Sequence, residues 1–128
     1  KYNSANLLCL NNYAYFLSLA NLRLDDAEAM SKRTVDHEPN NATYLDTYAW
    51  ILYQQKRYEQ AYEIIERCIA CADSTGTGDA TLYEHAGDIN YRAGRRTAAN
   101  NYWRRASRHA KTPAERRRIN QKVRRRRP

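Results

Sequence analysis

Two apolar runs of helical period, joined by a short polar link, are the feature of this sequence that most constrains its fold. Both lie between residues 44 and 70. Apolar residues recur at three- and four-residue intervals, which marks one face of an amphipathic helix. The first run comprises Leu45, Tyr48, Ala49 and Leu52, and the second Tyr58, Ala61, Ile64, Ile65 and Cys68. Two such helices with a short link predict an antiparallel hairpin.

The same outline recurs on both sides of this segment. A small residue in the second run marks each copy, at Ala27, Ala61 and Ala99, with spacings of 34 and 38 residues. The extra length of the second spacing fits a loop over residues 73–79 that is rich in Gly, Ser and Thr. Because one hairpin cannot bury its apolar face alone, we expect three hairpins stacked on one another.

Residues 112–127 are predicted to form a polar helix that covers the last hairpin. Thr112 suits the helix N-cap, Pro113 the first helical position, and Glu115 completes a capping box. Ile119 and Val123 form a narrow apolar stripe that can dock on the hairpin. A terminal repeat needs a polar outer cover of this kind to stay soluble.

This pattern resembles the tetratricopeptide repeat, in which two antiparallel helices recur every 34 residues. The family's small residue in the first helix matches Ala14, Ala49 and Gly87, and its small residue in the second helix matches the three alanines named above. The first hairpin departs from the family pattern, because Ser31 and Thr34 stand where a large and a small residue are usual.

The resemblance implies an all-α fold of three tetratricopeptide-like hairpins plus a C-terminal capping helix, wound into a right-handed α-solenoid. We expect a single domain over residues 1–128, with repeats at about 4–38, 42–72 and 79–109 and the capping helix at about 112–127. The chain begins at Lys1 rather than Met, so we expect it to be a fragment of a longer protein.

The first helices of such hairpins line a concave face that usually binds a peptide or a partner protein, as the resemblance implies. Projected onto that geometry, the candidate binding residues are Asn11, Tyr15, Ser18, Asp46, Trp50, Tyr53, Glu84, Asp88 and Tyr91. They predict an aromatic groove with three carboxylates, which favours a basic or amide-rich ligand. The alternative is that these residues serve only surface or inter-repeat packing.

One subgroup of the family clamps a C-terminal carboxylate with Lys, Arg and Asn on the concave face. Here the corresponding places carry Asp46, Glu84 and Asp88, and only Asn11 and Arg92 fit that chemistry. The resemblance therefore does not extend to recognition of chaperone tails. A further alternative is that the chain is a structural segment of a longer solenoid with no ligand of its own.

The charge is divided unevenly along the chain. Residues 1–80 hold 7 Lys and Arg against 11 Asp and Glu, whereas residues 81–128 hold 15 against 3. A candidate basic surface comprises Arg116, Arg117, Arg118, Arg124 and Arg125. A solvated capping helix explains it most simply, and binding to an acidic protein or to nucleic acid remains open.

No residues suggest catalysis, a metal site or a cofactor. Cys68 and Cys71 have C-x-x-C spacing, but no second pair accompanies them, and we interpret them as structural thiols. His85 is expected at the surface, without a nucleophile or an oxyanion donor nearby. The unpaired cysteines favour a reducing, cytoplasmic compartment. No run of apolar residues is long enough for membrane insertion.

The first helix offers a second kind of contact. If further repeats precede it in a longer protein, the face of residues 4–20 that packs on them is uncovered here. Leu7, Leu8, Phe16 and Leu19 are the candidates for that face. Exposed apolar patches favour self-association, and we predict a dimer through this end.

Overall fold

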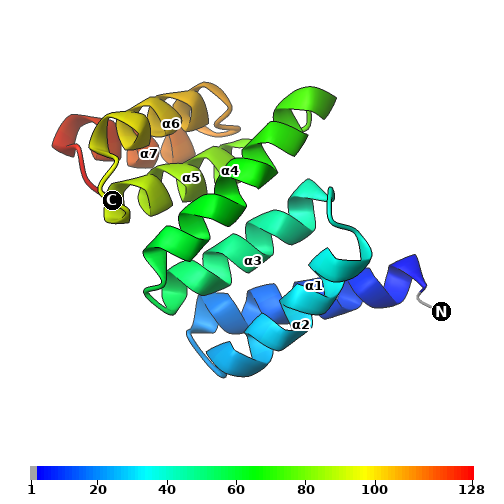
Figure 1. Cartoon of the computed structure of the whole chain (residues 1–128). Helices are drawn as coiled ribbons and strands as arrows, with labels where there is room; N and C mark the ends of the chain where they lie inside the picture. The colour runs from blue at the N-terminus through cyan, green and yellow to red at the C-terminus, as the bar shows by residue number, and fades with distance from the viewer. Residues whose placement is uncertain (1–2) are drawn as a thin grey trace.

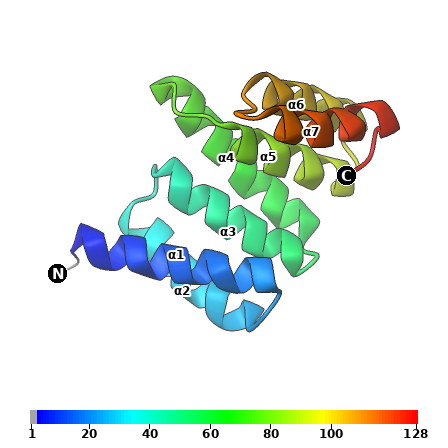
Figure 2. The ribbon, with the colours of Figure 1, turned by 180° about the vertical axis from the view of Figure 1, so that it is seen from behind.

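The computed structural model describes residues 3–128 and contains, over that range, seven helices and no strand. The helices are α1 (Ser4–Ala20), α2 (Leu24–His37), α3 (Ala42–Gln54), α4 (Tyr58–Thr75), α5 (Ala80–Arg92), α6 (Arg96–Arg108) and α7 (Pro113–Arg125). Figure 1 shows three successive hairpins, α1–α2, α3–α4 and α5–α6, with α7 beside α6. The view from behind in Figure 2 shows the same order. The predicted all-α solenoid is confirmed.

Side-chain caps fix where the first helix of each hairpin begins. Asn41 Oδ1 accepts from the Tyr44 N–H at 3.1 Å, and Asp79 Oδ1 accepts from the Leu82 N–H at 2.9 Å. Such caps satisfy N–H groups that have no partner inside the helix. α4 continues to Thr75, past the predicted end of the second hairpin at residue 72, and stops at Gly76 in the left-handed conformation.

The terminal helix α7 begins at a cap that differs in part from the one predicted. The Thr112 hydroxyl accepts from the Glu115 N–H at 3.1 Å, as a capping box requires. The Glu115 carboxylate, however, accepts from the N–H of Lys111 at 2.8 Å instead of from that of Thr112. Ile119 is completely buried and docks α7 on the core.

Small residues let the two helices of each hairpin approach closely. Ala49 and Ala61 are completely buried in the middle hairpin. In the third hairpin the corresponding residue on α5 is Gly87, and a Cβ there would overlap the indole ring of Trp103 from α6. The missing side chain therefore makes the room that the largest buried residue occupies.

The first hairpin is packed differently from the other two. Ala14, Leu17 and Ala27 form a small apolar cluster of their own with Ile51 of α3. Ser31 and Thr34 of α2 are buried where the family has a large and a small residue. The Thr34 hydroxyl donates to the Ser31 carbonyl at 2.7 Å, whereas the Ser31 hydroxyl has no partner among the described residues. The departures seen in the sequence thus reduce the apolar contact of this hairpin.

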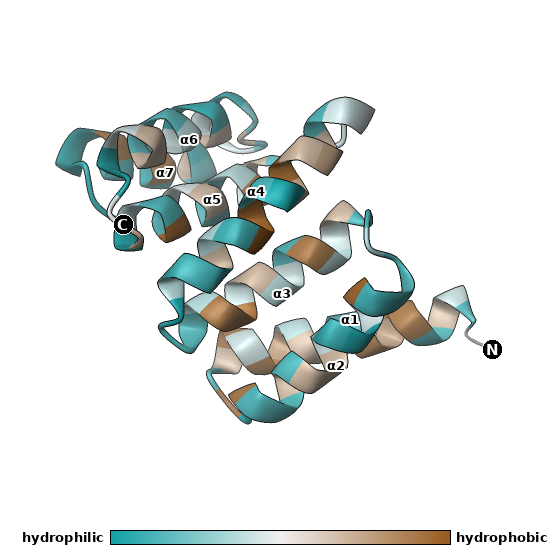
Figure 3. Cartoon of the chain, viewed as in Figure 1, coloured by the Kyte–Doolittle hydropathy of each residue, from teal (hydrophilic) through white to brown (hydrophobic). Residues whose placement is uncertain are grey.

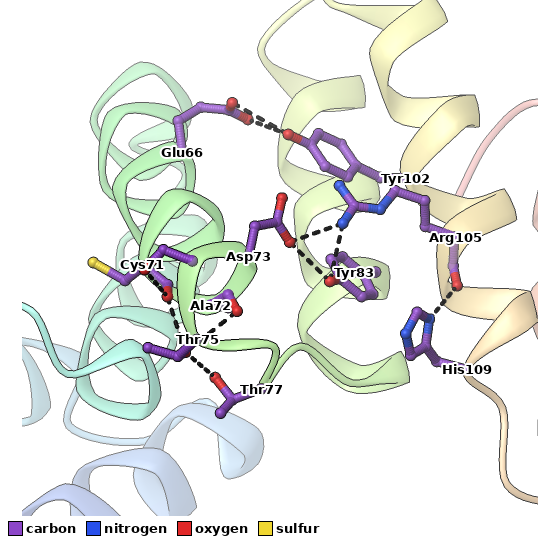
Figure 4. Close-up of polar contacts among 11 residues, drawn as sticks. Glu66, Cys71, Ala72, Asp73, Thr75, Thr77, Tyr83, Tyr102, Arg105 and His109 are labelled. Atoms are coloured by element: carbon purple, nitrogen blue, oxygen red, sulfur yellow. Dashed lines mark hydrogen bonds and ion pairs between the residues drawn. The ribbon is translucent and has the colours of Figure 1, made fainter.

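Polar contacts join the middle hairpin to the third on the side of the second helices, as Figure 4 shows. Asp73, near the end of α4, accepts from the Tyr83 hydroxyl at 3.0 Å and from Arg105 at 2.8 Å. Glu66 accepts from the Tyr102 hydroxyl at 3.1 Å. These bonds link α4 to both α5 and α6, so we interpret them as structural.

The outer face of α1 is the most apolar part of the surface. Leu8, Phe16 and Leu19 are each about half exposed, at 48%, 59% and 58%. Figure 3 shows brown, hydrophobic segments along α1, in contrast with the mostly teal α6 and α7. The expectation for Leu7 was wrong: its side chain is buried, because it belongs to the core cluster that also contains Val35.

Candidate functional site

A stack of rings crosses the surface formed by α1, α3 and α5, which we name the first-helix face. Tyr15 of α1 approaches His85 of α5, with ring centroids 6.3 Å apart. His85 stacks on Trp50 of α3 at 3.9 Å, and Trp50 stacks on Tyr53 at 4.5 Å. Three helices from three different hairpins thus contribute to one aromatic surface. Stacking of this kind holds the rings in fixed positions.

Three of these rings are candidates from the sequence, and all three are half-buried: Tyr15, Trp50 and Tyr53. The Nε1–H of Trp50 is buried and has no hydrogen-bond partner within residues 3–128. A buried indole N–H is usually bonded, so an unpaired donor at this place is unusual.

His85 is buried, contrary to the surface position expected from the sequence. Its Nδ1 lies 2.8 Å from Asp46 Oδ1 on α3. Burial alone would lower the pKa of His85, but Asp46, with help from Asp88 and Glu84, outweighs it and raises the pKa. The two residues lie 39 positions apart, close to one repeat, and this spacing is the only trace of the pair in the sequence.

Acidic side chains give the first-helix face negative charge at the N-terminal ends of α3 and α5. A cavity of about 160 Å³ opens there, and Asp46 and Asp79 are among its lining residues, with Thr43, Thr77 and Thr81. Burial raises the pKa of Tyr15, and the carboxylates of Asp46 and Asp79 raise it further. The position and sign of this potential suit a cationic or amide group of a ligand.

The other two candidate carboxylates are occupied from within the chain. Glu84 accepts from Arg118 at 3.0 Å, and Lys122 Nζ lies 2.6 Å from its other oxygen. Lys122 also contacts Asp88, which accepts in addition from the Trp103 indole at 3.0 Å. Glu84 and Asp88 are therefore buried beneath α7 and do not face a ligand directly.

The pKa values of these two carboxyl groups shift in opposite directions. Burial alone would raise the pKa of Glu84, but the hydrogen bonds from Arg118 and Lys122 outweigh it and lower the pKa. For Asp88 burial prevails and raises the pKa, although Lys122 and Trp103 oppose it. The prediction of three free carboxylates in one groove is corrected: Glu84 and Asp88 are paired with α7, and Asp46 is paired with His85 at the acidic corner that it forms with Asp79.

The remaining candidates for the groove lie at its two ends. Asn11 and Ser18 of α1 are buried, and the Ser18 hydroxyl donates to the Tyr15 carbonyl at 2.6 Å, so neither is accessible. Tyr91 of α5 is half-buried against Trp103, with ring centroids 6.1 Å apart. Arg92, next to Tyr91, adds positive charge at this end, and Tyr53 raises the pKa of its guanidinium.

The candidate basic surface lies along α7. All five candidates are exposed, namely Arg116, Arg117, Arg118, Arg124 and Arg125, and Arg118 is also paired with Glu84. Within residues 3–128 no group of His, Cys, Asp and Glu is arranged to hold a metal ion. In the same range, none of the helices combines the length and apolarity needed to cross a bilayer. Cys68 is buried, Cys71 is half-buried, and both are free thiols.

Comparison with solved structures finds the same fold in proteins of low sequence identity. PcrH in complex with the chaperone binding region of PopD superposes with a TM-score of 0.80 at 16% identity, over 98% of this chain and 93% of that chain. The type III secretion translocator chaperone SycD of Yersinia enterocolitica gives 0.80 at 12%, over 98% and 86%. The first repeat domain of Spaghetti (RPAP3), bound to the HSP90 peptide SRMEEVD, gives 0.78 at 15%, over 97% and 92%.

Comparison with curated proteins finds no match. A family model does match, over residues 20–86, and its description is anaphase-promoting complex, cyclosome, subunit 3. These residues run from the end of α1 through the middle hairpin into α5. The match spans more than half of the chain, and the protein therefore belongs to this family of tetratricopeptide-repeat proteins.

Proposed function

We propose that the chain is a protein-interaction module that binds a segment of a partner protein along the first-helix face. The observation that carries this proposal is the aromatic surface of Tyr15, Trp50 and Tyr53, which His85 joins, with the indole N–H of Trp50 that has no partner within residues 3–128. Rigid aromatic side chains supply a large contact area at low entropic cost, and they dominate many interfaces.

The solved relatives support this class of function. PcrH holds a region of PopD, and the Spaghetti domain holds an HSP90 peptide. Tetratricopeptide families are typically non-enzymatic scaffolds, and we propose no catalytic activity for this chain. The family model is named for a subunit of a multiprotein complex, which fits a scaffold as well.

The chemistry of the site favours a basic or amide-rich segment. Asp46 and Asp79 meet at the cavity between the N-terminal ends of α3 and α5, and this corner would accept a Lys or Arg side chain. The peptide in the Spaghetti structure carries two Glu and one Asp. An acidic segment of that kind would meet repulsion at this corner.

A peptide library tests the proposal. Displayed random peptides would be selected on the chain and then titrated by fluorescence anisotropy against the wild type and Trp50→Ala. We expect enrichment of peptides with Lys, Arg, Asn or Gln, and a loss of about 30-fold in affinity for Trp50→Ala, the size of a typical aromatic anchor. Trp50→Phe keeps the packing but removes the N–H donor, and should give a smaller loss.

The matched control is Glu63→Ala, at an exposed position of α4 outside the first-helix face. Circular dichroism would check that each variant keeps its fold. Selected peptides that bind Trp50→Ala and Tyr53→Ala as tightly as the wild type would show that the site is elsewhere. Enrichment of acidic peptides would overturn the proposed ligand class.

Self-association through α1 is a second candidate, favoured by its exposed Leu8, Phe16 and Leu19. No residue of α1 is charged, so two copies could meet there without like-charge repulsion. The cationic helices α6 and α7 lie at the other end of the stack (Figure 1) and would stay apart. A two-fold dimer uses one self-complementary patch on each copy.

A further inference from the structure

A cavity of about 420 Å³ lies between α6 and the residues that follow α7. Six residues line it: Arg96, Thr97, Asn100, Asn101, Arg104 and Arg126. Five of them belong to α6, where residues 96, 100 and 104 lie one turn apart along one stripe. That stripe runs beside the buried stripe of Ala99 and Trp103, so it faces outward next to the core.

The three guanidinium groups of this cavity are not neutralised by the chain. None of the ion pairs formed within residues 3–128 involves Arg96, Arg104 or Arg126. The neighbouring Arg105 differs, because it pairs with Asp73 and donates to the Tyr83 hydroxyl (Figure 4). Three like charges gathered around one cavity favour a bound anion.

None of the six residues that line the cavity is acidic. Glu115 is the one acidic residue of segment 93–128, and it lies in the first turn of α7, at the opposite end of that helix from Arg126. Arg96 is held in place over the Tyr91 ring, with its guanidinium carbon 5.1 Å from the centroid. The positive charge is therefore concentrated at the cavity, where Arg96 is held in place and a ligand can enter.

A second observation points to a ligand at the same place. The side-chain oxygen of Asn100 is buried and has no hydrogen-bond partner in the described part of the chain. Unpaired buried acceptors are rare in folded proteins. The N–H or O–H of a bound group, such as the backbone amide beside an anionic side chain, would satisfy it.

We propose that this cavity binds a phosphate group carried by a partner protein. Planar guanidinium groups donate two parallel hydrogen bonds to a phosphate, and clusters of Arg are the usual reader of phosphorylated side chains. The Thr97 hydroxyl and the Asn101 amide add neutral donors. The volume falls within the range of ordinary ligand pockets, so it holds a phosphorylated side chain with its flanking backbone.

A polynucleotide fits the cavity less well. Proteins that bind single strands combine cations with aromatic rings on which successive bases stack. The lining of this cavity contains no aromatic residue. The cavity is lined by α6, which is the second helix of the third hairpin, and by Arg126 after α7. It lies apart from the first-helix face, so this proposal does not depend on the groove.

The test compares Arg104→Gln with Arg117→Gln. Both variants remove one positive charge from an exposed arginine, but Arg117 lies outside the cavity. The probes are inorganic phosphate, a degenerate phosphoserine peptide pool, the same pool without phosphate, and single-stranded oligouridine. Binding would be measured by calorimetry for phosphate and by fluorescence anisotropy for the labelled probes.

We expect the phosphoserine pool to bind more tightly than its unphosphorylated counterpart, and Arg104→Gln to weaken that binding about tenfold or more. Arg117→Gln should stay within about twofold of the wild type. Arg104→Lys keeps the charge but loses the paired donors, so it should fall between the two.

Three outcomes would overturn the proposal. Equal losses in Arg104→Gln and Arg117→Gln would indicate diffuse attraction by net charge. Equal affinity for the two peptide pools would show that phosphate is not recognised. Oligouridine that binds more tightly than the phosphoserine pool, with a steep salt dependence and no sensitivity to Arg104→Gln, would assign the basic end to nucleic acid instead.

Discussion

Lys122 of α7 places its ammonium nitrogen 3.1 Å from both carboxylate oxygens of Asp88 on α5. Both side chains are close to fully buried, at 13% and 10% exposed. The same nitrogen reaches Glu84, so one cation from the last helix neutralises two carboxylates of the third hairpin. The terminal helix thus closes the solenoid by charge as well as through the apolar side chain of Ile119.

Replacing Lys122 by Met should lower the free energy of unfolding by about 3 kcal/mol, since it leaves buried carboxylates without their partner. The midpoint of urea unfolding measures this, provided the slope is unchanged. Adding Glu84→Gln and Asp88→Asn to Lys122→Met should recover part of the loss. The control Arg117→Gln, on the exposed side of α7, should change the free energy of unfolding little. A Lys122→Met variant as stable as Arg117→Gln would contradict this prediction.

Replacing Gly87 by Ala should destabilise the chain by about 2 kcal/mol, because the new Cβ overlaps the Trp103 indole. Helix propensity alone predicts the opposite sign, a gain of up to about 1 kcal/mol for Gly→Ala within a helix. Thermal unfolding of the two proteins decides between these effects. In a Trp103→Leu background the penalty for Gly87→Ala should shrink. If Gly87→Ala alone melted at or above the temperature of the wild type, the packing argument would be refuted.

The His85–Asp46 pair predicts how stability depends on pH. The pKa of His85 is raised in the folded chain, so its contribution is complete below the unfolded value of about 6.5 and is lost as the pH rises through the folded-state pKa. The acidic groups that act on His85 are Asp46, Asp88 and Glu84, and the rings of Trp50 and Tyr15 lie beside it.

Urea titrations of the wild type and His85→Gln, taken from pH 6 upward, isolate this contribution. The difference in unfolding free energy between the two should decrease as the pH rises. Asp46→Asn should remove the same pH dependence, because it removes the charge that holds the proton. A difference that grows with pH would show that burial, which lowers the pKa, controls His85 instead.

The exposed face of α1 predicts reversible dimerisation. Sedimentation velocity of the wild type should show a dimer that increases with concentration, and Phe16→Glu with Leu19→Glu should leave the chain monomeric. Gln121→Glu on α7 adds charge at an exposed position away from α1 and should dimerise as the wild type does. A wild-type chain that stays monomeric at every concentration would rule this contact out.

The fold was predictable from the sequence because its determinants are local and periodic. The small residues Ala49, Ala61 and Gly87 lie at the helix crossings where the resemblance placed them, and Asn41, Asp79 and Thr112 cap the helices that follow. Each of these features depends on neighbours within one hairpin. A pattern read along the chain therefore captures them.

The candidate site was predictable only in part, because its chemistry depends on pairs formed between hairpins. Projection onto first helices identified Tyr15, Trp50 and Tyr53, but it could not show that α7 covers Glu84 and Asp88. Nor did it show that His85 turns inward to Asp46. Leu7 and Ser18 were misplaced for a similar reason, since the helical period alone does not tell which side of α1 meets the next hairpin.

The indole signals of the two tryptophans give the most direct test of the proposed groove. The Trp103 N–H is bonded to Asp88 in the core, whereas the Trp50 N–H, on the first-helix face, has no partner in the part of the chain that the structure describes. In a ¹⁵N correlation spectrum titrated with a selected basic peptide, the Trp50 signal should shift downfield as its N–H finds an acceptor, and the Trp103 signal should stay in place. Saturating peptide that leaves the Trp50 signal unmoved would contradict the central claim.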